Sequence, residues 1–393
     1  MIKINLLILI IISSFQSWSL QGLTIQTIDY SFQDKWHRTV SSSTPKISIA
    51  EHVFKKQYFY VTAIASDFAL DAEGRANVTY SIFITSPNGS SYAEQKDLPL
   101  IQGMVTNKTN LQMSNNVLKI CFEENDEFGK YVIGIEIIDH VSGEQKKLQS
   151  NLKLVELPSY KDTKVKNDAD FSTWISTYYQ HQKPEEALSY YLYYAKSKLS
   201  DNESSFWPVF SIFMEIAKNN AYLLPQITEC YVKQDLKTKI YLLYLLRYSG
   251  IGTADFYEQL EGDEKKTYLK LKDSPDKDFY GEITDPAQLD MLWGTFTASG
   301  SYEPILKLIQ TLDYEKYQGA LDNFKKSKQT EEDRNLALKN AIYNALVWSM
   351  KSNARQHELV KAYLVWALNN ETLSEIQKTE LKNLMFSKNS GEK

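Results

Sequence analysis

Two different spacings of hydrophobic residues divide the chain. From about Leu23 to Glu156, apolar and polar positions alternate with a period of two, which is the pattern of half-buried β-strands. The stripes with this spacing are Tyr58/Tyr60/Thr62/Ile64, Val78/Tyr80/Ile82/Ile84 and Tyr131/Ile133/Ile135/Ile137. Turn sequences such as Ser86-Pro87-Asn88-Gly89 separate them. The pattern predicts an antiparallel β-sandwich over residues 20–157.

Beyond residue 170 the spacing changes to the 3.6 residues of an amphipathic helix. Two apolar faces with this spacing are Leu338/Ala341/Ile342/Ala345 and Val360/Tyr363/Leu364/Ala367. Asp285-Pro286 predicts a helix start, and Gly250, Gly262 and Gly300 predict helix ends. We therefore expect an all-helical domain over residues 171–388, joined to the strands by a polar linker at residues 158–170.

The first residues have the layout of a secretory signal peptide. Lys3 precedes an unbroken apolar run from Leu6 to Ile12, and Ser17 and Ser19 suit the two small positions before a cut. The run is shorter than the roughly 20 residues that span a bilayer. We expect a signal peptide at residues 1–19 and no transmembrane segment in the mature chain; the alternative is an uncleaved N-terminal anchor.

One short segment resembles a motif of immunoglobulin domains. The stretch from Asp126 through Gly129 and Tyr131 to Ile133 is similar to their Asp…Gly-x-Tyr-x-Cys segment, in which the Tyr hydroxyl bonds to the chain just upstream. Ile133 stands where the Cys would be. The resemblance therefore implies an immunoglobulin-like sandwich without its disulfide. The alternative is an ordinary hairpin with a Tyr in the following strand.

Further resemblances lie in the helical part. Pro184-Glu185-Glu186-Ala187 and Gly300-Ser301-Tyr302-Glu303 resemble helix starts of tetratricopeptide repeats. No strict 34-residue repeat joins them, so this resemblance implies irregular helical hairpins. Residues 289–300 and 345–357, around Trp293 and Trp348, resemble segments of uncharacterised exported bacterial proteins. That resemblance implies a periplasmic or secreted location and no particular activity.

Composition removes several classes of function. The formal net charge of -5 gives no basic footprint for nucleic acid. No catalytic or metal-binding motif occurs, and the 49 acidic residues single out no catalytic pair. His181 and Glu185 are four residues apart, but Pro184 lies between them. We assign no cofactor, no metal ligand and no catalytic residue, and we expect Cys121 and Cys230 to be thiols.

One group of residues in the helical part could line a binding pocket. Aromatic and polar side chains on facing helices suit a small ligand or a glycan. The candidates are Asp290, Trp293, Trp348, Asn353, Gln356 and His357. The alternative is that the two tryptophans belong to the core while the polar groups cap helix ends.

The sequence favours a non-catalytic exported protein that binds an unknown protein or glycan partner. The alternative is a hydrolase of an extracellular polymer, with its site between the two domains. Acidic residues with perturbed pKa values in a deep cleft would favour the enzyme. A concave helical face with exposed aromatic residues would favour binding.

The predicted signal peptide has a direct test. N-terminal sequencing of exported material should begin at or near Leu20, because the small residues Ser17 and Ser19 suit cleavage after Ser19. A mature chain that still begins with Met1 would contradict cleavage.

Overall fold

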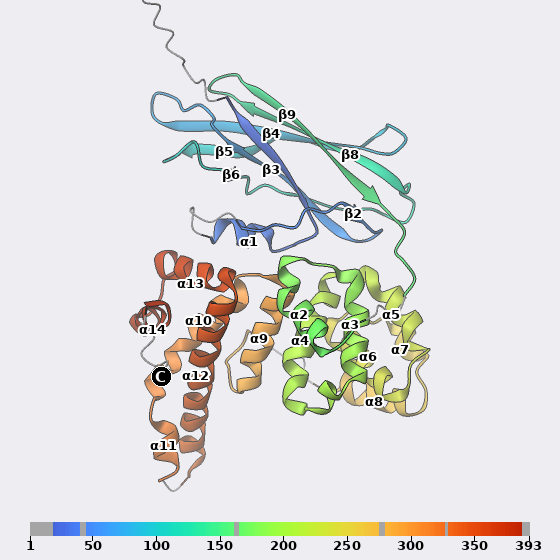
Figure 1. Cartoon of the computed structure of the whole chain (residues 1–393), viewed down its shortest axis with the longest axis vertical. Coiled ribbons are helices and arrows are strands. Elements are labelled where there is room, and N and C mark those ends of the chain that lie inside the picture. Colours follow the sequence, from blue (N-terminus) through green and yellow to red (C-terminus); the bar gives the residue numbers. More distant parts are fainter. Residues whose placement is uncertain (1–18, 40–44, 161–164, 275–279, 327–328, 387–393) are drawn as a thin grey trace, which may run out of the picture. The chain divides into compact units, whose positions relative to one another are not determined.

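The structure is a computed structural model that describes residues 19–39, 45–160, 165–274, 280–326 and 329–386. The predicted signal peptide falls on residues 1–19, of which 1–18 lie outside the described residues, as do residues 161–164 of the predicted linker. A β-rich region precedes a helical region along the chain (Figure 1), as the two hydrophobic periods predict.

The strands form two sheets. One has the order β1-β3-β6 with β7 also paired to β3, and the other has the order β2-β9-β8-β4-β5. In the second sheet β4 pairs antiparallel with β8, so that Ile82 lies opposite Ile135. The strands are β1 (Gln21–Thr27), β2 (His52–Val53), β3 (Tyr58–Ser66), β4 (Arg75–Thr85), β5 (Ser91–Met104), β6 (Gln112–Met113), β7 (Leu118–Cys121), β8 (Gly129–Asp139) and β9 (Gln145–Leu154).

The predicted apolar stripes are buried. Along β4 every second residue from Val78 to Ile84 is at most 1% exposed, and the same holds closely along β8 from Tyr131 to Ile137. Tyr131, at the start of β8, donates its hydroxyl hydrogen to the carbonyl oxygen of Glu127 at 3.0 Å. This bond has the direction that the motif around Tyr131 predicts.

The α-helices follow the strands along the chain, except that the short α1 lies between β1 and β2. They are α1 (Phe32–His37), α2 (Asp168–Thr177), α3 (Pro184–Lys196), α4 (Glu203–Asn219), α5 (Leu224–Tyr231), α6 (Leu236–Ser249), α7 (Ala254–Glu258), α8 (Gly262–Lys272), α9 (Pro286–Ser299), α10 (Glu303–Thr311), α11 (Ala320–Phe324), α12 (Glu331–Gln356), α13 (Glu358–Asn370) and α14 (Glu375–Phe386). Within the described ranges, no helix combines the length and the apolar character needed to cross a bilayer.

Most of the predicted helix boundaries are confirmed. Asp285 caps α9 with a capping box, while Gly250 and Gly300 end α6 and α9 in the left-handed conformation. The prediction for Gly262 is wrong, because this residue begins α8. Asp263 and Glu264 follow it in the first turn, where acidic side chains stabilise a helix start. The helix α2 begins at Asp168, inside the predicted linker.

A glycine brings two helices of the helical region together. A Cβ atom on Gly294 of α9 would lie 1.9 Å from the Ser211 Oγ and 2.9 Å from the Pro208 carbonyl oxygen of α4. No side chain fits at such distances, so the close approach of α4 and α9 requires glycine here. Through this close contact α4 packs on α9, and α9 in turn packs on α10 and α12.

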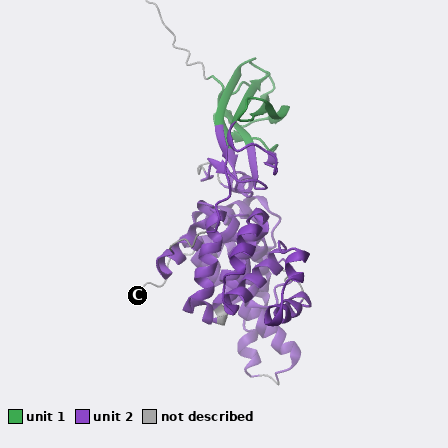
Figure 2. Ribbon diagram, turned by 90° about the vertical axis from the view of Figure 1, so that its right-hand side faces the viewer, with its two compact units in different colours: residues 1–25, 62–117, 132–150 green, residues 26–61, 118–131, 151–393 purple. Residues whose placement is uncertain are grey.

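The described chain divides into two compact units (Figure 2). The first contains residues 1–25, 62–117 and 132–150, and the second contains residues 26–61, 118–131 and 151–393. The second unit thus includes α1 and several strand ends together with all the other helices. The cavities discussed below lie within this second unit.

The Tyr131 hydrogen bond gives a stability prediction. Replacing Tyr131 with Phe removes one buried hydrogen bond, so the free energy of unfolding should fall by about 1 kcal/mol. Urea denaturation measures this difference. The matched control is Tyr193→Phe. The Tyr193 hydroxyl donates to Asp168 at an exposed position, so its loss should change the free energy of unfolding little. Equal effects of the two substitutions would contradict the prediction.

Candidate functional site

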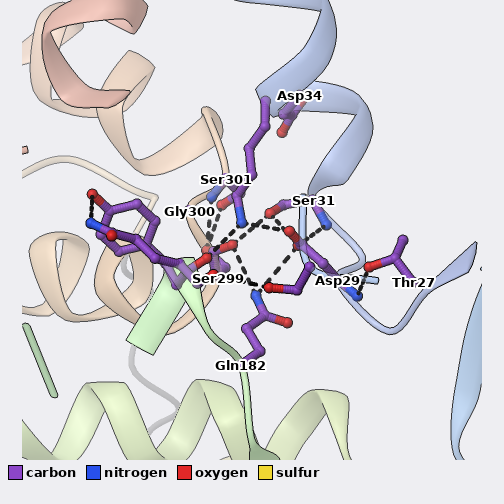
Figure 3. A network of polar contacts seen from close by, with 12 residues as sticks. Thr27, Asp29, Ser31, Asp34, Gln182, Ser299, Gly300 and Ser301 are labelled. Atoms are coloured by element: carbon purple, nitrogen blue, oxygen red, sulfur yellow. Dashed lines mark hydrogen bonds and ion pairs between the residues drawn. The ribbon is translucent and has the colours of Figure 1, made fainter. Parts of the chain in front are cut away.

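The site is built on a turn that follows β1. The side chain of Asp29 accepts hydrogen bonds through Oδ1 from the backbone N–H of Ser31, at 3.0 Å, and from its hydroxyl, at 2.8 Å. Such bonds from a short acidic side chain to residues just ahead favour a turn and a helix start. Thr27 supports the turn by accepting the N–H of Asp29 at 3.1 Å (Figure 3). The turn leads directly into α1.

A buried ion pair closes this turn onto α1. Lys35 Nζ lies 2.6 Å from Asp29 Oδ2, and each side chain is only 2% exposed. The ammonium group also donates to the carbonyl oxygen of Tyr179 at 2.9 Å. Charges are removed from water at high cost, and here that cost is offset by close pairing and additional hydrogen bonds. The pair thus fixes α1 to the chain at Tyr179.

The same network holds the end of α9 (Figure 3). The Ser31 hydroxyl has one hydrogen, which is shared between Asp29 Oδ1 and the Ser299 carbonyl oxygen, 2.5 Å away. Gln182 Nε2 donates to the same carbonyl oxygen at 3.3 Å. The hydroxyl of Tyr363 donates to the Gly300 carbonyl oxygen at 2.7 Å. The final carbonyls of a helix lack partners within the helix, so these donors complete the end of α9.

Gly300 is required at this point for two reasons. Its φ angle of +71° is a conformation that residues with side chains rarely adopt. In addition, a Cβ atom here would lie 2.4 Å from Cε of Lys35. The glycine therefore makes room for the stem of the buried lysine.

A second pair of charges extends the network along α1. Arg38 forms an ion pair with Asp34, and Asp34 Oδ2 accepts the backbone N–H of Tyr302 at 3.2 Å. The Arg38 guanidinium lies 4.8 Å from the ring centroid of Tyr302 and 5.1 Å from that of Trp366. Both distances are within the range of cation–π attraction. One face of α1 is thus attached to α10 and α13.

The network borders a cavity of about 520 Å³. Its walls come from the turn before α1 and from the ends of α4, α6, α9 and α10. The lining residues are Tyr30, Ser31, Asp34, Met214, Glu215, Lys218, Arg247, Tyr248, Ser249, Gly250, Tyr280, Thr295, Ser301 and Glu303. This volume lies in the range of small-ligand sites.

Tyr30 and Glu215 form the central polar contact of the cavity. Tyr30 lies between Asp29 and Ser31, so the buried network fixes its backbone on both sides. Its hydroxyl donates to Glu215 Oε1 at 2.8 Å, and Asn219 Nδ2 donates to the same oxygen at 2.8 Å. Burial, followed by the charge of Glu215, raises the pKa of Tyr30 well above its usual value. Tyr30 is therefore a neutral hydrogen-bond donor at physiological pH.

Charged groups of both signs surround this contact. Lys218 and Arg247 lie in the last turns of α4 and α6, where cations interact favourably with the helix ends. Glu303 lies in the first turn of α10. Burial, together with the charges of Glu303 and Glu215, raises the pKa of Tyr280. The negative charges of the two glutamates thus both favour the protonated form of Tyr280 in the cavity wall.

This arrangement offers donors, acceptors and aromatic surface within one cavity. A ligand could donate to glutamate oxygens, accept from Lys218 or Arg247, and pack against tyrosine rings. Within the described ranges, no group of three or more His, Cys, Asp or Glu side chains is placed to hold a metal ion.

The residues predicted from the sequence lie elsewhere in the helical region. Trp293 is buried, and its Nε1 donates to the Ser349 hydroxyl at 3.1 Å. Trp348 is 73% exposed, and Asp290 is also exposed. The two tryptophans therefore do not share one pocket wall.

The other three predicted residues cluster near the junction of α12 and α13. Asn353 donates to the Ser349 carbonyl oxygen at 2.9 Å within its own helix. His357 Nδ1 lies 3.2 Å from the Tyr179 hydroxyl, and burial lowers its pKa. Gln356 borders a cavity of about 390 Å³ that Tyr179 also lines. Gln356 is thus one member of the predicted group that borders a cavity.

The residues of the Tyr30–Glu215 cavity could not be predicted from the sequence. Tyr30 and Glu215 are separated by 185 positions, and Ser31 and Ser299 by 268 positions. No local spacing relates such residues. The one local signal is the Asp29-Tyr30-Ser31 sequence, whose acidic and hydroxyl side chains are typical of a turn before a helix.

Comparisons with known proteins do not identify a family. No family model and no curated protein matches the chain. Among solved structures, one alignment is to a family 123 glycoside hydrolase from Clostridium perfringens, studied for glycolipid glycan hydrolysis, with 12% identity and a TM-score of 0.23. It covers 45% of this chain and 35% of that one.

Two further alignments are equally distant. A structure described as "pT26-6p" has 8% identity and a TM-score of 0.16, over 84% of this chain and 49% of that one. A family 76 glycoside hydrolase from a bovine Bacteroides thetaiotaomicron strain has 10% identity and a TM-score of 0.17, over 84% of each chain. The chain spans about a third and about half of the first two proteins. Similarity this low supports no inference about chemistry.

The buried ion pair predicts strong energetic coupling. Replacing Lys35 alone with Met leaves Asp29 buried without its cation, so the free energy of unfolding should fall by about 3–5 kcal/mol. The double variant Asp29→Asn/Lys35→Met should lose much less than the sum of the single losses. Chemical denaturation of the four proteins measures the coupling.

A surface pair provides the control for this cycle. Lys266 and Asp263 form an exposed ion pair, and Lys266→Met should change the stability little. Additive effects of the Asp29 and Lys35 substitutions would show that the buried pair does not act as a unit.

Proposed function

We propose that the chain is a non-catalytic binding protein that takes a small, hydroxyl-rich ligand, such as a mono- or disaccharide, in the cavity beside Tyr30 and Glu215. The observation that carries the proposal is the fixed contact between these two side chains. Both hydrogen bonds that the described residues make to Glu215 fall on Oε1. We assign Oε2 to a ligand hydroxyl, which donates to carboxylates readily.

The rest of the lining suits the same class of ligand. Sugars carry many groups that both donate and accept hydrogen bonds, and their C–H faces pack against aromatic rings. The cavity supplies carboxylates, an ammonium and a guanidinium group, and the rings of Tyr30, Tyr248 and Tyr280. Its volume of about 520 Å³ suits one or two sugar rings better than a polymer.

We also propose a location and a finer description of the fold. The N-terminal pattern supports export to the periplasm or the extracellular space. The Tyr131 bond to Glu127 supports an immunoglobulin-like sandwich. The start of α3 at Pro184 supports irregular tetratricopeptide-like hairpins. A glycan, rather than a protein, is the partner class we favour for the cavity.

A hydrolase is the second candidate function, because Glu215 and Glu303 approach the same cavity from different helices. Glycosidases use two carboxyl groups, one of which must be protonated to act as an acid. Oε1 of Glu215 already accepts hydrogen bonds from Tyr30 and Asn219, which hold this carboxylate as part of the cavity wall. We therefore favour binding. The hydrolase that the sequence left as the alternative has its site between the two domains, whereas this cavity lies within the second unit.

Thermal unfolding with a saccharide panel tests the proposed function. Glucose, galactose, mannose, N-acetylglucosamine and their disaccharides are the probes. At about 100 times its dissociation constant, a bound sugar should stabilise the protein by about 2.7 kcal/mol and raise the Tm by several degrees. Tyr30→Phe removes a hydroxyl and Glu215→Gln replaces a charged acceptor with a neutral amide, so each should weaken binding about tenfold.

Two measurements complete this test. Tyr314→Phe is the matched control, since its hydroxyl bonds to the Ile283 carbonyl oxygen and does not line the cavity. It should leave sugar binding unchanged. Release of reducing ends from a disaccharide, abolished by Glu215→Gln or Glu303→Gln, would replace the binding proposal with the hydrolase. No shift with any probe would refute both.

A further inference from the structure

The hairpin of β4 and β5 ends in a turn that contains the one Asn-Gly sequence of the chain, Asn88-Gly89. The two strands pair as far as Thr85 and Ser91, so residues 86–90 form the tip of the hairpin. Both residues of the Asn-Gly sequence are exposed to solvent. Exposed turns at hairpin tips are the parts of a domain that open most easily. The hairpin tip belongs to the first compact unit, away from the residues that line the Tyr30–Glu215 cavity.

Hydrogen bonds hold the side chain of Asn88 within the turn. Its Oδ1 accepts the backbone N–H of Ser90 at 2.9 Å, and the Ser86 Oγ lies 2.9 Å from the same oxygen. When a nucleophile attacks an amide carbon, negative charge develops on the amide oxygen, and N–H or O–H donors at that oxygen stabilise the charge. The turn therefore places donors at the oxygen that would carry the charge if Asn88 Cγ were attacked.

The next residue, Gly89, supplies a nucleophile. When the backbone nitrogen that follows an asparagine attacks Cγ, a five-membered ring closes. A side chain on the following residue crowds this approach, and glycine has none. A Cβ atom at Gly89 would have no neighbour within 4 Å, so the surroundings of this residue are also open. The one contact that must be released is the hydrogen bond from the Gly89 N–H to the Ser86 carbonyl oxygen, at 3.0 Å.

We propose that Asn88 is a site of spontaneous deamidation, through a cyclic imide formed with Gly89. The Gly89 nitrogen forms a bond to Asn88 Cγ, and the Cγ–Nδ2 bond breaks. The Gly89 proton passes through water to Nδ2, which leaves as ammonia. One water molecule then opens the imide at either of its two carbonyl groups, which gives aspartate or isoaspartate. Each product adds one negative charge to the formal net charge of -5.

The two products should affect the turn differently. Aspartate keeps a side-chain oxygen that can accept the Ser90 N–H, so the turn should persist. Isoaspartate carries the main chain through the side-chain carbon, which lengthens the backbone by one atom. The bonds from the Ser86 N–H to the Ser90 carbonyl oxygen and from the Gly89 N–H to the Ser86 carbonyl oxygen then no longer fit together. Isoaspartate should therefore loosen the end of the hairpin.

Ageing of the purified full-length protein in neutral buffer, followed by trypsin digestion and mass spectrometry, tests the proposal. Cleavage after Arg75 and Lys96 releases the peptide 76–96, which contains both Asn77 and Asn88. Asn88 should gain the mass of an amide-to-acid exchange. The conversion should be faster at higher pH, because the attacking nitrogen must lose its proton.

Two references calibrate the measurement. Asn77 is the internal control, because it is also exposed but precedes the β-branched Val78, and it should stay unmodified. The free peptide 76–96 gives the rate without the fold. In the folded chain one hydrogen bond must open first, so Asn88 should convert about five- to tenfold more slowly than in the peptide.

Hydrogen exchange of the backbone amides of residues 86–91 separates the two products. These amides should exchange faster in the aged protein than in fresh protein, while the variant Asn88→Asp should behave like fresh protein. Equal exchange in the aged protein and in Asn88→Asp would show that isoaspartate does not loosen the hairpin.

The deamidation itself is overturned by either of two results. One is an Asn88 that stays unmodified in the folded protein over a period in which the free peptide converts completely, since the hairpin then prevents ring closure. The other is equal conversion of Asn77 and Asn88, since the reaction would then not depend on Gly89.

Discussion

The buried ion pair between Asp29 and Lys35 is the constraint on which the rest of the second unit depends. Each group is 2% exposed, so neither can exchange its partner for water. Asp29 also accepts from Ser31, and Lys35 also donates to the Tyr179 carbonyl oxygen. A buried pair is weak support for stability in itself, but it penalises any arrangement that separates the two charges. It thus selects one position for α1 among helices that follow it by more than a hundred residues.

The position of α1 in turn determines the chemistry of the cavity. Tyr30 belongs to the turn that the pair fixes, and its hydroxyl donates to Glu215 at 2.8 Å, the usual length of an O–H···O hydrogen bond. Gly300 contributes by admitting the Lys35 stem where any side chain would clash. A site assembled this way is preorganised, because its polar groups are ordered before a ligand arrives. That is the property expected of a receptor whose donors and acceptors must keep fixed positions.

Sequence patterns predicted the features that depend on residues close together along the chain, such as strand faces and helix caps. The stripe from Val78 to Ile84 and the cap at Asp285 are local features, and the structure confirms both. The helix end predicted at Gly262 is wrong, because a glycine alone does not indicate whether a helix ends or begins there. The cavity could not be predicted, since Tyr30 and Glu215 meet only through tertiary structure. The pocket was predicted from aromatic and polar residues on facing helices, and the structure places Trp293 in a core and leaves Trp348 exposed.

The abundance of tyrosine links the core to the cavity beside Tyr30. The chain has 26 tyrosines, and most buried tyrosine hydroxyls in proteins have a hydrogen-bond partner. Tyr363 and Tyr191 donate to the backbone carbonyl oxygens of Gly300 and Tyr241, and thereby join distant segments. Tyr30 donates to a side chain that borders a cavity instead. Among the described residues, the buried hydroxyl of Tyr222 has no hydrogen-bond partner. It has given up water without gaining a bond in exchange, so it costs stability where the hydroxyls of Tyr363 and Tyr191 hold the fold together.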